Sequence, residues 1–261
     1  MNWIEALILG LIQGLTEFLP VSSSGHLELG KAVLGVEYSE NLTFTVVVHG
    51  ATVLSTIVVF WSTIRDLLLG FFKWQWNDST KYIVKLLFSM IPVVIIGLLL
   101  EDQIESLFAG NVMFVGFMLL ITAGLLAFTY YAKDLNKEMG FRQAFIVGIA
   151  QALAVLPGVS RSGSTIATSL YLGINKEEAA RFSFLMVLIP ILGANAKDLI
   201  SKDFSAMSSP DILPLVIGFV AAFFSGLLAC KWMISLVKRG KLIYFAIYCL
   251  IIGLIAVIAG I

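Results

Sequence analysis

The 261-residue sequence has little charge, cysteine or histidine, and each shortage excludes a class of protein. Charged residues make up 13% of the chain, against about 25% in a typical soluble domain, which argues against a soluble core. Cys230 and Cys249 lie inside apolar segments and no zinc-type Cys/His cluster accompanies them, so we expect neither a disulfide nor a zinc site. The formal net charge of zero argues against nucleic acid as a partner.

Long apolar runs take the place of the missing charge, since hydrophobic residues make up 59% of the chain. A membrane-spanning helix needs roughly 20 mostly apolar residues. Six segments approach this length: 44–61, 83–100, 112–132, 182–199, 213–237 and 242–260. No polar stretch is long enough to fold alone, so residues 1–261 are predicted to form a single membrane domain. The first five residues resemble no cleavable signal peptide.

Basic residues gather in three places, which predicts the orientation of the spans. They lie between the first two spans (Arg65, Lys73, Lys81, Lys85), after the third (Lys133, Lys137, Arg142) and before the last (Lys231, Lys238, Arg239, Lys241). Cytoplasmic loops carry the excess of Lys and Arg, so these regions are predicted to lie inside. The acidic turn at 101–105 and the loop 200–212 then lie outside, together with both termini.

The sequence resembles itself when it is shifted by 138 positions. Residues 1–26 then fall on 139–164, with identities at Met1, Ala6, Ile8, Gly10, Gln13, Leu15, Val21, Ser22, Ser24 and Gly25. This predicts two repeats, 1–138 and 139–261. Each holds a broken element followed by three spans, and the odd number turns the second copy upside down. In such inverted-topology proteins the sites form near the membrane midplane.

The broken elements are 3–33 and 141–173. Each is predicted to be a helix, a break rich in Pro, Gly and Ser, and a helix too short to cross a bilayer, so both are interpreted as re-entrant hairpins. Irregular backbone at membrane depth must be buried in protein or line a wet cavity. The predicted fold is therefore an all-α integral membrane protein with six transmembrane helices and two re-entrant helical hairpins in an inverted repeat.

The first hairpin carries Gln13 and Glu17, which share a helix face because they are four residues apart. A carboxylate deep in an apolar helix is a functional candidate by default, although Glu17 could also be a structural partner for a serine or arginine. After Pro20, the segment Ser22, Ser23, Ser24 and Gly25 opens a helix whose first N–H groups have no partner. This predicts an anion cradle, or simple capping of a buried break.

Two histidines are present, and their surroundings differ. His26 follows the serines directly and has a carboxylate nearby in sequence, which suggests a general acid or base, or a phosphoryl acceptor. His49 lies alone inside the span 44–61, and we interpret it as a core residue with satisfied hydrogen bonds.

The second hairpin repeats the cradle with Ser160, Ser162 and Gly163, but two of its other side chains differ from those of the first hairpin. Arg161 stands where the first hairpin has Ser23, and Ser164 stands where it has His26. Arginine is a fork-shaped phosphate donor, and near the midplane it needs an anion. That anion is either Glu17 as a permanent partner or a phosphate, and we favour the phosphate, with Glu17 as the resting counter-ion.

These two segments resemble the motifs of the undecaprenyl-diphosphate phosphatase family of the bacitracin-resistance type, and the resemblance runs the full chain. The first motif is E/Q-x-x-x-E followed by P-V-S-S-S/T-G-H, met by Gln13, Glu17 and Pro20–His26. The second is P-G-x-S-R-S-G-x-T, met by Pro157–Thr165.

The resemblance implies an enzyme of the bacterial inner membrane that removes the terminal phosphate from undecaprenyl diphosphate. It also implies a homodimer that is surrounded by membrane lipids and has an active site opening toward the outer face. It implies catalytic roles for Glu17, Ser23, His26 and Arg161. The phosphate-side groups would be Gln13, Ser22, Ser24, Gly25, Ser160, Ser162, Gly163, Ser164 and Thr165.

Family members are associated with Mg or Ca, but Gln13 stands where many have Glu. Glu17 is then the single hard ligand, so a metal would be held mainly by the diphosphate.

The mechanism and one rival function stay open at this point. Ser23 could attack the phosphate with His26 as base and Glu17 orienting it, His26 could itself be the nucleophile, or water could attack directly. Inverted repeats with re-entrant hairpins are also transporter architecture, so a lipid-phosphate flippase or anion carrier is the alternative. A carrier has no need of a nucleophile beside a base, which favours the enzyme.

Overall fold

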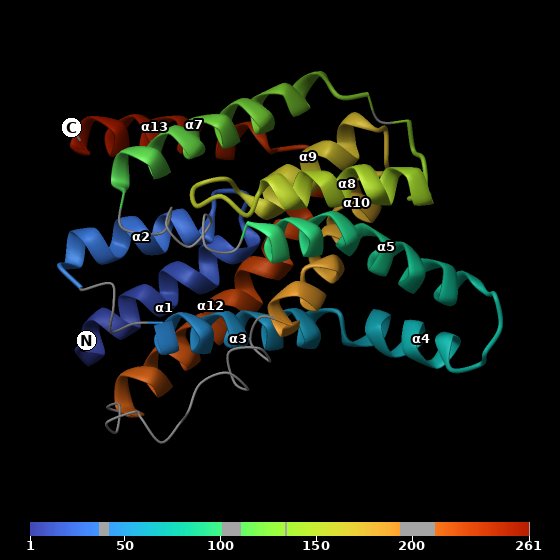
Figure 1. Cartoon of the computed structure of the whole chain (residues 1–261), viewed down its shortest axis with the longest axis horizontal. Coiled ribbons are helices and arrows are strands. Elements are labelled where there is room, and N and C mark those ends of the chain that lie inside the picture. Colours follow the sequence, from blue (N-terminus) through green and yellow to red (C-terminus); the bar gives the residue numbers. More distant parts are fainter. Residues whose placement is uncertain (37–41, 101–110, 134, 194–211, 261) are drawn as a thin grey trace.

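The computed structural model describes residues 1–36, 42–100, 111–133, 135–193 and 212–260, which form a bundle of helices (Figure 1). Within these ranges the single β feature is an isolated bridge between Lys137 and Ile174. The helices are α1 (Trp3–Phe18), α2 (Ser23–Leu34), α3 (Leu42–Val59), α4 (Trp61–Phe71), α5 (Asp78–Leu99), α7 (Val112–Phe128), the 3-10 turn η1 (Thr129–Tyr131), α8 (Phe141–Leu153), α9 (Arg161–Tyr171), α10 (Lys176–Met186), α12 (Ile212–Lys238) and α13 (Ile243–Ala259).

Three described helices are long and apolar enough to cross a membrane: α5, α7 continued through η1, and α12. A fourth span is possible if α3 and α4 count as one, although their axes bend by 76° at a break next to Phe60. α13 is apolar but has only 17 residues. The prediction of an all-helical membrane protein is confirmed at this level, and the count of six spans stays a prediction.

The expected span 182–199 differs most from the structure. α10 covers its start and ends at Met186, the chain turns at Val187, and the residues from 188 to 193, where the described range ends, are helical again. Residues 194–199 lie outside the described residues, as do most of the two loops predicted to lie outside, 101–105 and 200–212.

Both broken elements are helix–break–helix units, as expected from the sequence. α1 begins at a capping box in which Asn2 and Glu5 satisfy each other's backbone N–H groups, and it ends where Leu19 turns extended before Pro20, because a residue that precedes proline avoids helical geometry. α8 ends at Leu153, and seven residues of break separate it from α9.

Close helix packing relies on small residues, which let backbones approach in membrane bundles. On α1, a Cβ added to Gly10 would lie 2.5 Å from the carbonyl oxygen of Gly218 on α12. Between α7 and α13, a Cβ on Gly116 would lie 2.9 Å from the oxygen of Gly253. α12 thus packs against α1 on one side of the first hairpin, and α7, which is paired with α13, packs against α2 on the other (Figure 1).

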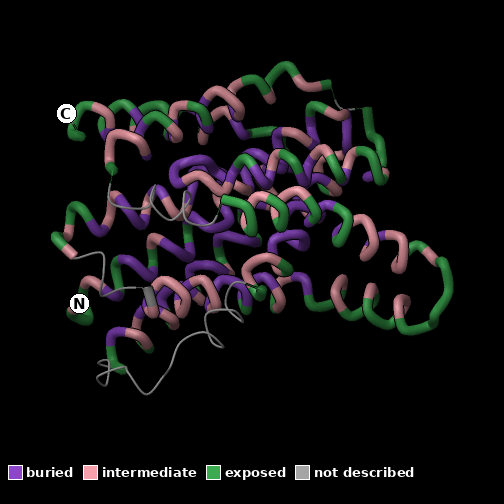
Figure 2. Tube along the Cα trace, in the orientation of Figure 1, coloured by how far each residue is buried: buried purple, intermediate pink, exposed green. Residues whose placement is uncertain are grey.

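The buried residues lie mainly in the middle of the bundle, and the exposed ones lie at its ends and outer sides (Figure 2). Phe18 belongs to an apolar cluster with residues of α5, α8, α9, α10 and α12, whereas Val21 belongs to the cluster between α7 and α13. The first break is thus anchored in two cores at once. This fixes the backbone from which the polar side chains of the site project.

Candidate functional site

The two breaks meet in the middle of the bundle. The hydroxyl of Ser162 donates to the carbonyl of Leu19 over 3.2 Å, and a Cβ on Gly25 would lie 3.0 Å from the Cα of Gly158. Thr122 of α7 holds the second break, because its Oγ1 accepts from the Ser160 N–H (3.0 Å) and donates to the Gly158 carbonyl (3.1 Å). The N-termini of α2 and α9 consequently lie beside each other.

Each of these N-termini is capped by the first serine of its motif. The Gly25 N–H donates to Ser22 Oγ over 3.3 Å, and the Gly163 N–H donates to Ser160 Oγ over 3.0 Å. Helix geometry leaves the two preceding N–H groups of each helix without an intrahelical acceptor. Together with the dipole of each helix, they make the junction a favourable place for an anion.

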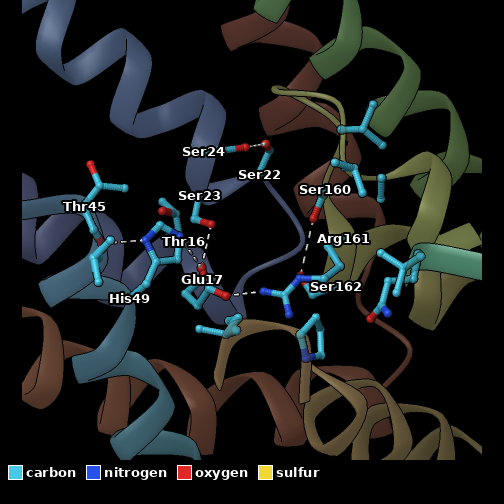
Figure 3. A pocket seen from close by; sticks show the side chains of 18 residues that line it. Thr16, Glu17, Ser22, Ser23, Ser24, Thr45, His49, Ser160, Arg161 and Ser162 are labelled. Atoms are coloured by element: carbon cyan, nitrogen blue, oxygen red, sulfur yellow. Dashed lines mark hydrogen bonds and ion pairs between the residues drawn. The ribbon is translucent and has the colours of Figure 1, made fainter. Parts of the chain in front are cut away.

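Glu17 lies at the centre of the junction with its side chain only 4% exposed. Its Oε1 forms an ion pair with Arg161, which reaches across from the second hairpin (Figure 3). Its Oε2 accepts from the Ser23 hydroxyl over 2.7 Å and from Gln13 Nε2 over 2.9 Å. A buried carboxylate needs such partners, because an unpaired charge away from water is costly.

His49 of α3 also reaches this carboxylate, contrary to the expectation of a core residue. Its Nε2 lies 3.9 Å from Glu17 Oε2, and its side chain is 24% exposed. Its Nδ1 lies 2.8 Å from the carbonyl oxygen of Thr45, one helical turn earlier (Figure 3). The one sequence signal that could have found it is the rule that an ionisable residue within a span is a functional candidate by default.

His26 lies elsewhere, and the expected contact between Glu17 and His26 is not formed. Its Nδ1 lies 2.9 Å from the carbonyl of Ser22 and its Nε2 lies 2.9 Å from the hydroxyl of Tyr248 on α13. The ring stacks on Tyr248 with centroids 5.5 Å apart. Both ring nitrogens are therefore engaged away from Ser23, because the side chain folds back along α2 toward α13.

A pocket of about 360 Å³ opens at the junction. Seven of the residues expected to act in the site line it: Glu17, Ser22, Ser23, Ser24, Ser160, Arg161 and Ser162. Six others do not line it: Gln13, Gly25, His26, Gly163, Ser164 and Thr165.

The six residues outside the pocket wall have other surroundings. Gln13 is fully buried behind Glu17. Thr165 hydrogen-bonds Ser183 of α10 over 2.5 Å, and the buried hydroxyl of Ser164 has no hydrogen-bond partner among the described residues. Their position supports roles in building the junction rather than in touching a ligand.

The pocket chemistry is that of an anion site with a nucleophile. Hydroxyl groups, one guanidinium and two helix N-termini surround a serine that already donates its proton to a carboxylate. Among the described residues, no group of three His, Cys, Asp or Glu side chains could hold a metal ion. Both oxygens of Glu17 are also engaged by protein groups, so a metal here would need ligands from the substrate.

Comparison with known proteins agrees with this geometry. The family described as "Bacitracin resistance protein BacA" matches residues 6–255. The chain belongs to this family.

Relatives in the family match this chain over nearly its full length. A Christiangramia forsetii protein named "Undecaprenyl-diphosphatase" is 57% identical over 260 residues, which cover 99% of this chain and 98% of the relative. A protein of the same name from Bacteroides fragilis is 56% identical over 263 residues, covering 100% and 99%. One from Halothermothrix orenii is 41% identical over the full length of both chains. The resemblance seen in the two motifs is thereby confirmed.

Proposed function

We propose that this protein hydrolyses undecaprenyl diphosphate to undecaprenyl phosphate and inorganic phosphate. The step recycles the lipid carrier of cell-wall synthesis and opposes bacitracin. The observation that carries the proposal is the contact of Ser23 and Arg161 with opposite oxygens of one buried carboxylate, Glu17. Phosphoryl transfer depends chiefly on such positioning and charge stabilisation.

The contacts support a two-step mechanism that begins at Ser23. Arg161 turns from Glu17 to the terminal phosphate, which the N–H groups of α2 and α9 also bind. Ser23 Oγ attacks the terminal phosphorus while its proton passes to Glu17 Oε2, 2.7 Å away. The bond between phosphorus and the bridging oxygen breaks, and the lipid leaves as its monophosphate.

The second step releases phosphate from the enzyme. Glu17 first loses its proton to water in the pocket, and then accepts a proton from the water that attacks the phosphoserine. The bond from Ser23 Oγ to phosphorus breaks, and Ser23 recovers a proton from Glu17. Trapping and mapping a phosphoryl group on Ser23 tests this sequence, whereas single-turnover hydrolysis with no phosphoenzyme would favour direct attack by water with Glu17 as the base.

His26 serves this mechanism as a positioning residue rather than as the base or nucleophile. Its ring links the Ser22 carbonyl to Tyr248, which ties the N-cap of α2 to α13. The loss caused by a His26→Ala substitution would then come from a displaced Ser23. A phosphohistidine at His26 would overturn this assignment and restore the histidine nucleophile.

The helix contacts support the inverted repeat with six spans and two re-entrant hairpins. α1 of the first half packs on α12 of the second, α8 of the second packs on α5 of the first, and α7 packs on α13. Such an exchange is what a pseudo-two-fold axis between halves 1–138 and 139–261 would produce. We place both termini and the pocket mouth on the outer face of the inner membrane, and the working form is a homodimer.

A divalent ion, Mg or Ca, would enter with the substrate. Among the described residues that line the pocket, Glu17 is the single carboxylate, so the diphosphate oxygens would provide most of the ligands. The protein's own groups would still position the phosphate and move the proton.

A carrier that binds lipid phosphate without cleaving it is the second candidate, since the pairing of Glu17 with Arg161 between two hairpins would also suit transport. The deciding experiment measures phosphate release from undecaprenyl diphosphate by purified protein in detergent, with and without Mg or Ca. Release by the wild type and its loss in Arg161→Ala support the enzyme. Binding without release, together with lipid flux in liposomes, would replace it with the carrier.

A further inference from the structure

We propose that Gln151 holds the water molecule that hydrolyses the phosphoserine formed at Ser23. Gln151 lies in the last turn of α8 and lines the pocket at the junction of the two breaks. It belongs to neither motif segment. This inference deepens the proposed function and rests on it, because the water that it concerns acts in the second step.

The side-chain amide of Gln151 is buried, and only one of its two ends is hydrogen-bonded. The residue is 2% exposed, and its Oε1 has no partner among the described residues. Its Nε2 donates to the sulfur of Met90 on α5 over 3.6 Å, and a thioether is a weak acceptor. An unsatisfied buried polar atom is costly. The amide oxygen is therefore available to a hydrogen-bond donor in the pocket.

Gln13 shows that an unpartnered amide oxygen does not by itself make a ligand site. Gln13 is the counterpart of Gln151 at a shift of 138 positions, and its Oε1 also lacks a partner among the described residues. It lies behind Glu17, to which its Nε2 donates, and it does not line the pocket. Gln151 has Val155 in the place of that carboxylate and does line the pocket. Its oxygen is consequently the one that a pocket ligand reaches.

Phosphoryl transfer restricts where the attacking water lies. The attacking and leaving oxygens are roughly in line through phosphorus, so the water that displaces Ser23 approaches from the side opposite Ser23 Oγ. The lipid monophosphate leaves from that side in the first step. Ser23 and Arg161 reach different oxygens of Glu17 from the two halves (Figure 3), and α8 packs against α9, which begins at Arg161. Gln151 thus belongs to the wall that faces Ser23 across the phosphate.

An amide oxygen suits this water because it accepts a hydrogen bond and takes no proton. Gln151 provides the single carboxamide among the described residues that line the pocket. One hydrogen of the water is donated to Oε1, and the other passes as a proton to Glu17. The bond from the water oxygen to phosphorus forms while the bond from phosphorus to Ser23 Oγ breaks, and Ser23 recovers a proton from Glu17. Gln151 therefore acts in the second step only.

The kinetic test uses Gln151→Leu, which removes the acceptor with little change in side-chain size. Enzyme is labelled from undecaprenyl diphosphate with a radioactive terminal phosphate, and a chase with unlabelled substrate gives the decay rate of the phosphoenzyme. Decay should be about fivefold slower than in wild type, the scale of one hydrogen bond to a neutral group. Formation of undecaprenyl phosphate in the first turnover should stay within about twofold, since the first step uses no water. Equal decay rates, or equal slowing of both steps, would overturn the proposal.

Met90→Leu is the matched control for this variant. It removes the sulfur to which Nε2 donates and leaves Oε1 in place, with little change in buried volume. Both steps should match the wild type in Met90→Leu. If Gln151 acted only by linking α8 to α5, Met90→Leu would slow the enzyme as much as Gln151→Leu does, and that result would overturn the proposal.

Thermal unfolding in detergent gives a second measurement on Gln151→Leu. Leucine leaves no unsatisfied amide in the buried position, so the unfolding midpoint should be equal to or above that of wild type. A lower midpoint accompanied by slowing of both steps would assign Gln151 to the structure of the bundle and overturn its role in the second step.

The same measurements on wild type separate this inference from the proposed function. If wild type releases phosphate from the lipid and no phosphoenzyme forms, the phosphatase stands and the role of Gln151 in phosphoserine hydrolysis is overturned. If wild type releases no phosphate, the phosphatase itself fails, and the role of Gln151 fails with it.

Discussion

The two hairpins have the same capped helix start but present different side chains to the pocket. Ser22 and Ser160 make the same N-cap bond, yet Ser22 has a positive φ of 70° whereas Ser160 has φ −75° and leaves the sharp turn to Gly158, at φ 96°. The first break has four residues and the second has seven. Both units thus have a capped helix start, and the backbone reaches it by different routes.

The equivalent positions of the carboxylate also differ between the halves. Glu17 lies in the last turn of α1, so a helix fixes its position. Val155, its counterpart 138 residues later, lies beyond the end of α8. In the proposed mechanism the first half therefore provides a rigidly held acid and the nucleophile, and the second half provides Arg161, which binds the phosphate. If the halves have divided the labour in this way, substitutions at equivalent positions should fail differently.

The largest loss of activity is expected when Ser23 or Glu17 of the first half is replaced. Ser23→Ala removes the attacking oxygen and Glu17→Gln removes the proton acceptor, so each should lower kcat by about 10³- to 10⁴-fold, measured as phosphate release. Leu15→Ala, on the exposed side of α1, should stay near wild type. Retention of a tenth of the activity by Ser23→Ala would point to water as the nucleophile.

Replacing Arg161 of the second half should cause a somewhat smaller loss of activity, and it should also affect stability. Arg161→Lys keeps the charge and loses the planar fork, so kcat/KM should fall about 10²-fold. Arg161→Ala should lose more and also unfold more easily, because Glu17 is left buried without its main cation. Thermal unfolding in detergent checks the second effect, and equal stability of the two variants would contradict it.

Replacing the buried glutamine of either half, Gln13 or Gln151, is expected to have an intermediate effect on kcat. Gln13 donates to Glu17 Oε2 over 2.9 Å, whereas Gln151 donates only to the sulfur of Met90 over 3.6 Å. Gln13→Leu should therefore lower kcat by about tenfold, the scale of one hydrogen bond to a charged group, and Gln151→Leu by less. A larger loss for Gln151→Leu would indicate that its unpartnered Oε1 binds the substrate as well as a water.

The smallest effect is expected at the caps. Replacing a capping serine with alanine costs about 1 kcal/mol, and the shorter Ser160 bond (3.0 Å against 3.3 Å) should make Ser160→Ala the more destabilising. Unfolding midpoints of the two variants, compared in the same detergent, measure the difference. The reverse order would mean that the strained φ of Ser22 depends on its hydroxyl.

Much of the site could be predicted because its chemistry lies in two short segments. Glu17 stood out as a carboxylate in an apolar helix, and Arg161 as a cation that needs an anion. The serines beside Pro20 and Pro157 predicted two capped helix starts, and both are present. Local rules of capping and helix breaking act within a few residues, so a single sequence displays them.

The two histidines show that such local rules do not predict tertiary contacts. Sequence proximity favoured His26, but a side chain on a helix points to one side, and the neighbours on that side are Ser22 and Tyr248, 222 positions away. In the sequence His49 lies far from Glu17, and the packing of α3 against α1 brings the two side chains together. No local sequence pattern predicts this packing.

By itself the sequence determined a membrane-embedded helical chain and its two broken helices, and it predicted which residues bind phosphate. These follow from hydrophobicity, proline and serine, which act locally. The tertiary structure alone decided that Glu17 pairs with Arg161 across 144 positions, that His49 rather than His26 joins them, and that a single pocket collects both halves. Such contacts depend on how whole helices pack, and the close approach of α1 to α12 and of α7 to α13 determines where each side chain ends.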